Sequence, residues 1–123
     1  MISIDYRSGE PIYDQIVSGI LRLKAVGALS PGDKLPSVRA LALEIGINPN
    51  TVQKAYGILE SSGIICSVAG KGSFISRDEA AMEMITAAAR QDFAQAVRKA
   101  LAAGLTGAEL LELVRKEGGE KND

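Results

Sequence analysis

In the first half of the chain, two short amphipathic segments stand on either side of a very tight break. Ser37 can cap a helix that Gly46 ends, because glycine adopts the left-handed conformation that often follows a helix. Only one residue separates this glycine from Asn48 and Pro49, an N-cap residue followed by proline in the first helical turn. The sequence therefore predicts two short helices joined as a helix-turn-helix, the second extending from Pro49 to about Ser61.

The second helix combines an apolar face with a polar face that lacks acidic residues. Its apolar positions are Val52, Ala55, Tyr56 and Leu59, and its polar ones are Asn50, Thr51, Gln53 and Lys54. Amides, hydroxyls and ammonium groups contact base edges and phosphates in the major groove of DNA. A polar face is also what any solvated helix shows. The DNA interpretation gains support because none of the fifteen residues between Glu44 and Glu60 carries a negative charge.

A glycine-rich β-hairpin is predicted directly after the helix-turn-helix. The runs Ile64–Val68 and Ser73–Ser76 are typical of strands, and the segment Ala69–Gly72 between them is typical of a turn. A hairpin in this place is a wing, whose tip can bring Gly70 and Lys71 to the phosphates or the minor groove. The simpler alternative is a hairpin with a solvated lysine.

Further helices are predicted on both sides of this region. One begins at Pro11 and ends near Gly27, and another is expected over about Asp78–Ala103. The segment Thr106–Glu109 has the pattern of a capping box and should open a last helix. The expected fold class is mainly α with a small β-hairpin wing. Its parts are a winged helix-turn-helix over residues 1–77, a helical hairpin over residues 78–117 and a disordered tail over residues 118–123.

The composition argues against several other kinds of protein. Without histidine and with a single cysteine, the chain lacks His-based nucleophile pairs and the usual ligands of structural zinc. We therefore expect no catalytic residues, no metal and no cofactor, and we expect Cys66 to be a small buried apolar residue. A secretory signal and an apolar run of about 20 residues are both missing, which predicts a cytoplasmic protein without membrane contact. The net charge is +2 over residues 1–77 and −3 over residues 78–123, a modest basic excess on the predicted DNA-binding part.

The ordered motifs of residues 10–76 resemble the winged-helix domain of the GntR family of bacterial transcriptional regulators. They are Glu10-Pro11-Ile12-Tyr13-Asp14-Gln15-Ile16, Leu29-Ser30-Pro31-Gly32-Asp33-Lys34, Leu35-Pro36-Ser37-Val38-Arg39, Gly46-Ile47-Asn48-Pro49-Asn50-Thr51-Val52-Gln53-Lys54-Ala55-Tyr56 and Gly70-Lys71-Gly72-Ser73-Phe74-Ile75. So many motifs in this order make the resemblance highly specific. The Asn48-Pro49-Asn50-Thr51-Val52 form and the short C-terminal segment are most similar to the YtrA subfamily.

The resemblance implies which residues contact an operator. Arg39 matches the family's operator-contacting arginine, and Gly70 matches the glycine at the tip of its wing. One departure is that many members carry arginine where this chain has Pro49 and Gln53, so a guanine contact from those two positions is lost. The candidate DNA-binding residues are Lys34, Ser37, Arg39, Asn48, Pro49, Asn50, Thr51, Gln53, Lys54, Gly70 and Lys71.

The resemblance also implies a homodimer that binds an inverted-repeat operator on double-stranded DNA, most simply as a repressor that excludes polymerase. An apolar stripe on the predicted C-terminal helices is the candidate dimerisation surface. It consists of Met82, Ile85, Ala89, Phe93, Val97, Leu101, Leu110 and Leu113. Relatives of the YtrA type commonly control neighbouring membrane-transport genes. The sequence identifies neither the operator nor a small-molecule effector.

Two other classes of function are alternatives to DNA binding. A winged helix can serve as a protein-interaction module without specific DNA binding, since one fold hosts unrelated functions. An enzyme would need a convergent set of reactive side chains, and the serines, lysines and carboxylates show no such spacing. The prediction is therefore a DNA-binding regulator and not an enzyme.

Overall fold

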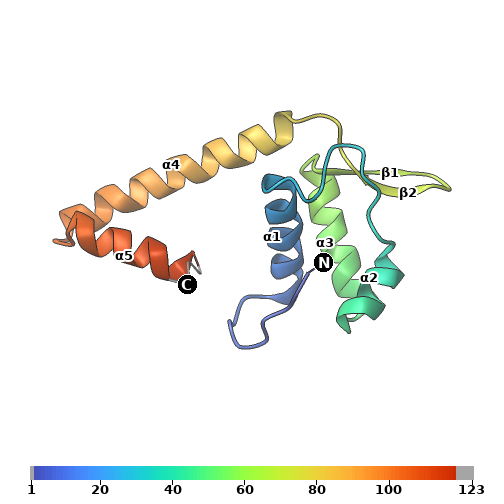
Figure 1. Ribbon diagram of the computed structural model, residues 1–123, viewed down its shortest axis with the longest axis horizontal. Coiled ribbons are helices and arrows are strands. Elements are labelled where there is room, and N and C mark those ends of the chain that lie inside the picture. The colour runs from blue at the N-terminus through green and yellow to red at the C-terminus, as the bar shows by residue number, and fades with distance from the viewer. Residues whose placement is uncertain (1, 119–123) are drawn as a thin grey trace. The chain divides into compact units, whose positions relative to one another are not determined.

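The computed structural model describes residues 2–118, which form five helices and one two-stranded hairpin (Figure 1). In chain order these are α1 (Ile12–Ala25), α2 (Val38–Ile45), α3 (Pro49–Ser61), β1 (Ile65–Val68), β2 (Gly72–Ile75), α4 (Ala80–Ala102) and α5 (Gly107–Glu117). The chain divides into two compact units, of which the first ends at Met82 and the second begins at Glu83. The predicted fold class, mainly α with a β-hairpin wing, is confirmed.

The helix-turn-helix forms where the sequence predicts it. At the start of α2 the N–H of Ala40 donates to Oγ of Ser37 at 3.0 Å, and Gly46 ends the helix with φ 68°. At the start of α3 the N–H of Asn50 donates to Oδ1 of Asn48 at 2.8 Å. Both caps satisfy amide groups that would otherwise lack a partner in the first helical turn.

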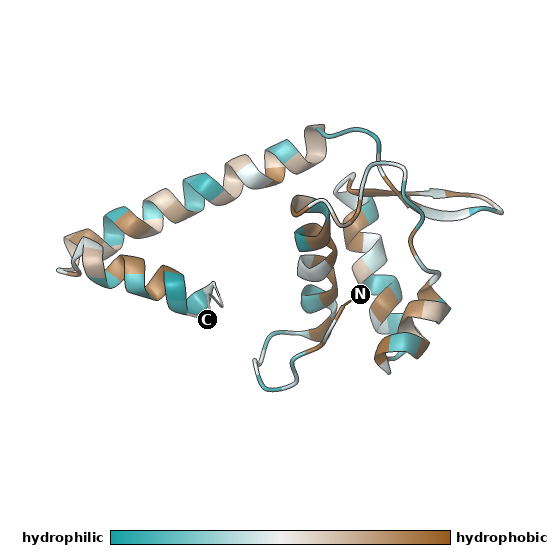
Figure 2. Ribbon diagram, in the orientation of Figure 1, coloured by the Kyte–Doolittle hydropathy of each residue, from teal (hydrophilic) through white to brown (hydrophobic). Residues whose placement is uncertain are grey.

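One apolar core lies among the first three helices and the base of the wing. Ile16 and Ile20 of α1 are fully buried, and α1 packs against α3 (Figure 1). Figure 2 shows hydrophobic residues on each of the first three helices. Each large aliphatic side chain buried in this way stabilises the fold by about 1.5–3 kcal/mol. The other buried apolar residues are Leu35, Leu41, Ala42, Val52, Ala55, Tyr56, Leu59, Ile64, Ile65 and Ile75. All four apolar positions predicted for α3 are therefore inside, which turns the opposite face of α3 to solvent.

The wing is an antiparallel hairpin with a third extended segment at its base. Ile65 pairs with Ile75 near the core and Val68 pairs with Gly72 near the tip. Lys34 forms a β-bridge with Phe74, which fixes the chain before α2 against the hairpin. The first predicted strand begins one residue before β1, and the second is shifted by one residue toward the C-terminus relative to β2. Of the predicted tip segment Ala69–Gly72, Gly72 is the first residue of β2 and the other three lie between the strands.

The expectation that Cys66 is buried is wrong, because its side chain is exposed. Side chains alternate between the two faces of a strand. In this hairpin the Ile65–Ile75 pair faces the core, and the next pair along, Cys66 with Phe74, lies on the other face. A two-stranded wing has no second layer to cover that face.

The residues before α1 are held on this helix by one glutamine. Oε1 of Gln15 accepts the N–H of Asp5 at 2.8 Å, and its Nε2 donates to the carbonyl oxygens of Asp5 and Glu10 at 2.9 and 3.0 Å. These bonds hold Asp5 and Glu10 against the start of α1.

The first residues of α4 belong to the first unit. Oδ1 of Asp78 accepts the N–H of Ala80 at 2.9 Å, so α4 begins at Ala80 and not at Asp78 as the sequence suggested. Nζ of Lys24, whose side chain is 5% exposed, lies 2.6 Å from Oε2 of Glu79. This ion pair joins the end of α1 to the start of α4.

The second unit contains most of α4 and all of α5. The predicted capping box is confirmed, since Oγ1 of Thr106 accepts the N–H of Glu109 and a carboxylate oxygen of Glu109 accepts the N–H of Thr106, each at 3.1 Å. Neither helix contains a fully buried residue. Of the tail predicted to be disordered, Gly118 follows α5 directly, and residues 119–123 lie outside the described residues.

Candidate nucleic-acid interface

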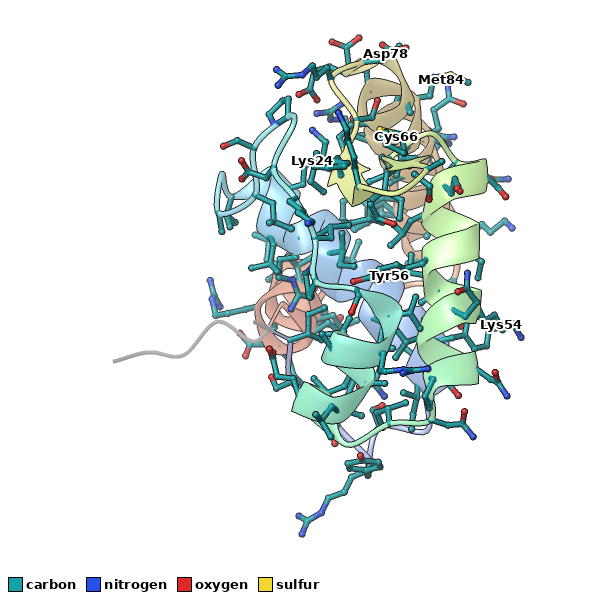
Figure 3. The ribbon with its side chains drawn as sticks, turned by 90° about the vertical axis from the view of Figure 1, so that its right-hand side faces the viewer. Lys24, Lys54, Tyr56, Cys66, Asp78 and Met84 are labelled. Carbon is teal, nitrogen blue, oxygen red and sulfur yellow. The ribbon has the colours of Figure 1, made fainter. Side chains whose placement is uncertain are left out.

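The outer face of α3 is polar and exposed. Asn50, Gln53 and Lys54 are exposed, Thr51 is half-buried, and Pro49 is exposed at the first helical position. Figure 3 shows Lys54 on the outer side of α3 and Tyr56 pointing from α3 toward α2. The face that the sequence singled out for its lack of acid is thus available to a large partner.

Two of the predicted DNA-binding side chains are already engaged in capping. Oγ of Ser37 and Oδ1 of Asn48 each accept a backbone N–H at the start of a helix. The amide nitrogen of Asn48 remains a donor, and the Ser37 hydroxyl can still donate its proton. Their first role is therefore to set the geometry of α2 and α3, and any DNA contact would use the atoms that remain.

One part-buried hydrogen bond helps to fix the orientation of α2 against α3. Oη of Tyr56, on α3, donates to the carbonyl oxygen of Pro36 at 2.7 Å, just before α2 begins. Burial, together with the negative charge of Glu44, raises the pKa of Tyr56 from 10.0 to about 12. Arg39 is exposed in the first turn of α2, so this bond also helps to set its position relative to α3.

We expect Tyr56→Phe to change the alkaline unfolding of the protein. Wild-type Tyr56 stays neutral in the folded state up to about pH 12 but ionises near pH 10 when unfolded. The contribution of Tyr56 to the free energy of unfolding is therefore complete below pH 10 and is lost as the pH rises through 12. Between these two values the free energy of unfolding should fall by about 1.4 kcal/mol per pH unit. At neutral pH the variant should lose only about 0.5–1.5 kcal/mol of unfolding free energy for the missing hydrogen bond.

The measurement is urea unfolding of both proteins between pH 8 and pH 12 (roughly the range spanning the two ionisations). Tyr6→Phe is the matched control, because it removes the same hydroxyl from a side chain that is 69% exposed. An equally steep alkaline decline in Tyr56→Phe and in wild type would show that another group titrates there.

The wing brings two cationic side chains near its exposed tip. Gly70, Lys71 and Gly72 are exposed, and Gly70 has a left-handed φ of 75°. A Cβ added to Gly72 would lie 3.1 Å from Cε of Lys34, so this lysine stem runs across the hairpin backbone. Glu60, near the end of α3, accepts the hydroxyl of Ser67 on β1 at 3.1 Å.

Sequence analysis did not find the side chains that support this surface from within the protein. Tyr13, on α1, lies beneath Lys54, whose Nζ is 3.8 Å from the centre of the ring. The sequence placed Tyr56 on the apolar face of its helix and assigned no contact to Tyr13, and only the packing of α1 and α2 on α3 shows their partners. Tyr13 does stand in one of the motifs that carry the family resemblance, which was the one available signal.

Other kinds of site find little support in the described part of the chain. Residues 2–118 contain no group of three His, Cys, Asp or Glu side chains that could hold a metal ion. Within the same residues no helix has the length and apolar character needed to cross a membrane.

The comparisons with known proteins point in one direction. Residues 10–75 match the bacterial regulatory proteins of the gntR family. The chain is 42% identical over 134 aligned positions to the HTH-type transcriptional repressor YtrA of Bacillus subtilis (strain 168), with all of both chains covered. Among solved structures it is similar to a GntR family transcriptional regulator from Listeria monocytogenes, with a TM-score of 0.73, 33% identity, and 90% and 98% of the two chains covered.

A further solved structure shows a similar domain with DNA. The AraR DNA-binding domain in complex with operator ORX1 has a TM-score of 0.55 and 28% identity, and the match covers 60% of this chain and 94% of that domain. The family match takes in more than half of this chain, including the helix-turn-helix and the wing. The chain therefore belongs to the gntR family of bacterial regulatory proteins, and it is a DNA-binding transcriptional regulator.

Proposed function

We propose that this regulator binds double-stranded operator DNA in the cytoplasm through the exposed face of α3, flanked by α2 and the wing. The observation that carries the proposal is the outer face of α3, which is exposed, polar and free of acidic residues over its whole length up to Glu60. A recognition helix must enter a groove lined by phosphates, so carboxylates on this face would oppose binding.

Each candidate residue has a contact that suits its chemistry. Asn50 and Gln53 carry amides that can pair with adenine, and Arg39 can bind a guanine or a phosphate with two parallel hydrogen bonds. Lys34, Lys54 and Lys71 are suited to phosphates, and the bare backbone of Gly70 allows a close approach. Thr51 and the remaining donors of Ser37 and Asn48 complete the surface, with Pro49 offering an apolar contact to a thymine methyl group.

We further propose that two copies of the chain pair through the second unit. A groove of about 320 Å³ between α4 and α5 is lined almost wholly by apolar side chains, among them Phe93, Val97, Leu101 and Leu110. Phe93 is 56% exposed and Leu113 47% exposed in the single chain, so a second copy would remove a large apolar area from water. Met82, Ile85 and Ala89 continue the same stripe toward the start of α4.

A symmetric pair would present two α3 helices to an inverted repeat. The half-sites would lie one DNA turn apart, about 34 Å, or a multiple of that distance. Repression by exclusion of polymerase is the simplest consequence, and it agrees with the name of YtrA from Bacillus subtilis, a transcriptional repressor. The AraR domain bound to its operator supports DNA as the partner in preference to a protein partner.

The test is a titration of a DNA fragment from upstream of the protein's own gene, followed by fluorescence anisotropy or gel shift. Binding should be tighter by about a thousandfold or more than to a scrambled duplex of the same length, and it should weaken with rising salt. A folded protein that binds the two duplexes equally, or neither at low salt, would contradict the proposal.

The amides of α3 should determine part of the operator sequence. We expect Asn50→Ala and Gln53→Ala each to relax the preference at one or two base pairs, at a cost of about 1–3 kcal/mol for the wild-type site. Binding selection from a random library measures this directly. An unchanged consensus in either variant would remove that residue from base recognition, and Arg98→Ala on exposed α4 serves as a control.

A further inference from the structure

The one cation of α3 does not extend freely into solvent. Lys54 is the only Lys or Arg in the helix, and its ammonium nitrogen lies 3.8 Å from the centre of the Tyr13 ring on α1. At this distance the positive charge is attracted by the negative face of the ring. In the described part of the chain the ion pairs are Lys24–Glu79 and Glu112–Arg115, so the charge of Lys54 faces a ring and not a carboxylate.

The ring leaves the charge of Lys54 available. A carboxylate would neutralise the ammonium and compete with a phosphate, whereas an aromatic face keeps the full positive charge and hydrogen-bond donors free on the other side. Lys54 remains exposed and Tyr13 is half-buried, so solvent or a partner can still reach the ammonium. A long lysine side chain also loses rotamer freedom when it binds, and a side chain already held in place loses less.

Tyr13 is held firmly enough to serve as such a support. It lies in the first turn of α1, one turn before the fully buried Ile16, and two residues later Gln15 ties the N-terminal arm to the same end of the helix. The helical turn that carries Tyr13 is therefore anchored by residues other than Lys54.

We propose that Tyr13 is a positioning residue for DNA binding, which holds the Lys54 ammonium at the edge of α3 where a backbone phosphate can bind it. The inference rests on the proposed function, because it assigns a role within the same interface. It also gives a purpose to the tyrosine of the Glu10–Ile16 motif, which the helix-turn-helix and the wing leave unexplained.

The experiment compares Tyr13→Leu, Tyr13→Phe, Lys54→Gln and the double variant Tyr13→Leu/Lys54→Gln on two duplexes. One duplex is the upstream region of the protein's own gene, and the other is a scrambled duplex of equal length. Tyr13→Leu should weaken binding to both duplexes by about two- to fivefold, and Tyr13→Phe, which keeps the ring, should stay close to wild type. Lys54→Gln should lower the slope of log K against log salt by about 0.9, the value for one phosphate.

The double variant provides the decisive comparison. If Tyr13 acts through Lys54, its loss should have no further effect once Lys54→Gln is present. The proposal would be overturned if Tyr13→Leu lowered the affinity for DNA equally in the wild-type and Lys54→Gln backgrounds, or if Tyr13→Leu alone left the affinity unchanged. Tighter binding by Tyr13→Leu would overturn it as well, because the ring would then be withholding the charge.

A graded series of substitutions at Tyr13 is the control for effects on folding. Phenylalanine, trifluorophenylalanine and pentafluorophenylalanine are close in size, but fluorine progressively removes the negative charge from the ring face. Affinity should fall along the series without a change in melting temperature, and a flat series would overturn the proposal. A wild-type protein that binds neither duplex would instead refute the proposed function, so the two failures are distinguishable.

Discussion

Arg39→Ala should weaken operator binding by about 1–3 kcal/mol, which is roughly a 5- to 150-fold loss of affinity. Arg39 is exposed in the first turn of α2, on a helix whose orientation the Tyr56–Pro36 hydrogen bond helps to fix. Because the side chain takes no part in the core, the melting temperature of the variant should match that of wild type. Anisotropy titrations on the operator and on a scrambled duplex measure the loss.

The comparison between the two duplexes separates the two possible contacts of Arg39. A guanine contact predicts a large loss on the operator and a small one on the scrambled duplex, whereas a phosphate contact predicts similar losses on both. Arg39→Lys keeps the charge but not the paired donors, so it should restore a phosphate contact and fail to restore a guanine contact. An affinity within twofold of wild type on the operator would exclude Arg39 from the interface.

Phe93→Asp should convert the proposed dimer into monomers and reduce operator affinity by about a hundredfold or more. The first effect follows because a carboxylate would have to be buried in the apolar groove between α4 and α5. The second follows because two half-sites bound by one linked pair gain from their high effective concentration, which monomers lose. Light scattering gives the mass, and anisotropy gives the affinity.

Met84→Asp is the matched control for this variant. Met84 lies on the same helix and is 73% exposed, but it does not line the groove. The control should remain dimeric and bind the operator like wild type. A dimer that survives Phe93→Asp would place the subunit contact elsewhere on the chain.

Local sequence signals were sufficient to predict the helix-turn-helix of the first unit and the last helix of the second. The caps at Ser37 and Asn48, the stop at Gly46 and the capping box at Thr106 act through neighbouring backbone groups, so a sequence shows them directly. The inward positions of α3 follow from helical periodicity in the same way. These features also fixed which face of α3 is free for a partner.

Contacts between distant segments could not be predicted in this way. Cys66 was assigned to the interior by residue type, but its burial depends on which face of the wing the helices cover. The pairing of Lys54 with Tyr13, and of Tyr56 with the backbone at Pro36, joins residues of different helices, and no short-range pattern in the sequence specifies it. The start of α4 was misplaced by two residues because Asp78 acts as a cap and not as a helical residue.

The placement of α3 in the major groove of two half-sites can be tested by DNA cleavage from a tethered iron chelate. The chain has one cysteine, exposed Cys66, so Cys66→Ser combined with Gln53→Cys gives a single attachment point on the outer face of α3. If each α3 of a pair enters the major groove of one half-site, we expect two clusters of cuts, related by the symmetry of the operator and separated by about one DNA turn or a multiple of it. A conjugate that binds the operator but yields no such pair of clusters would contradict this placement.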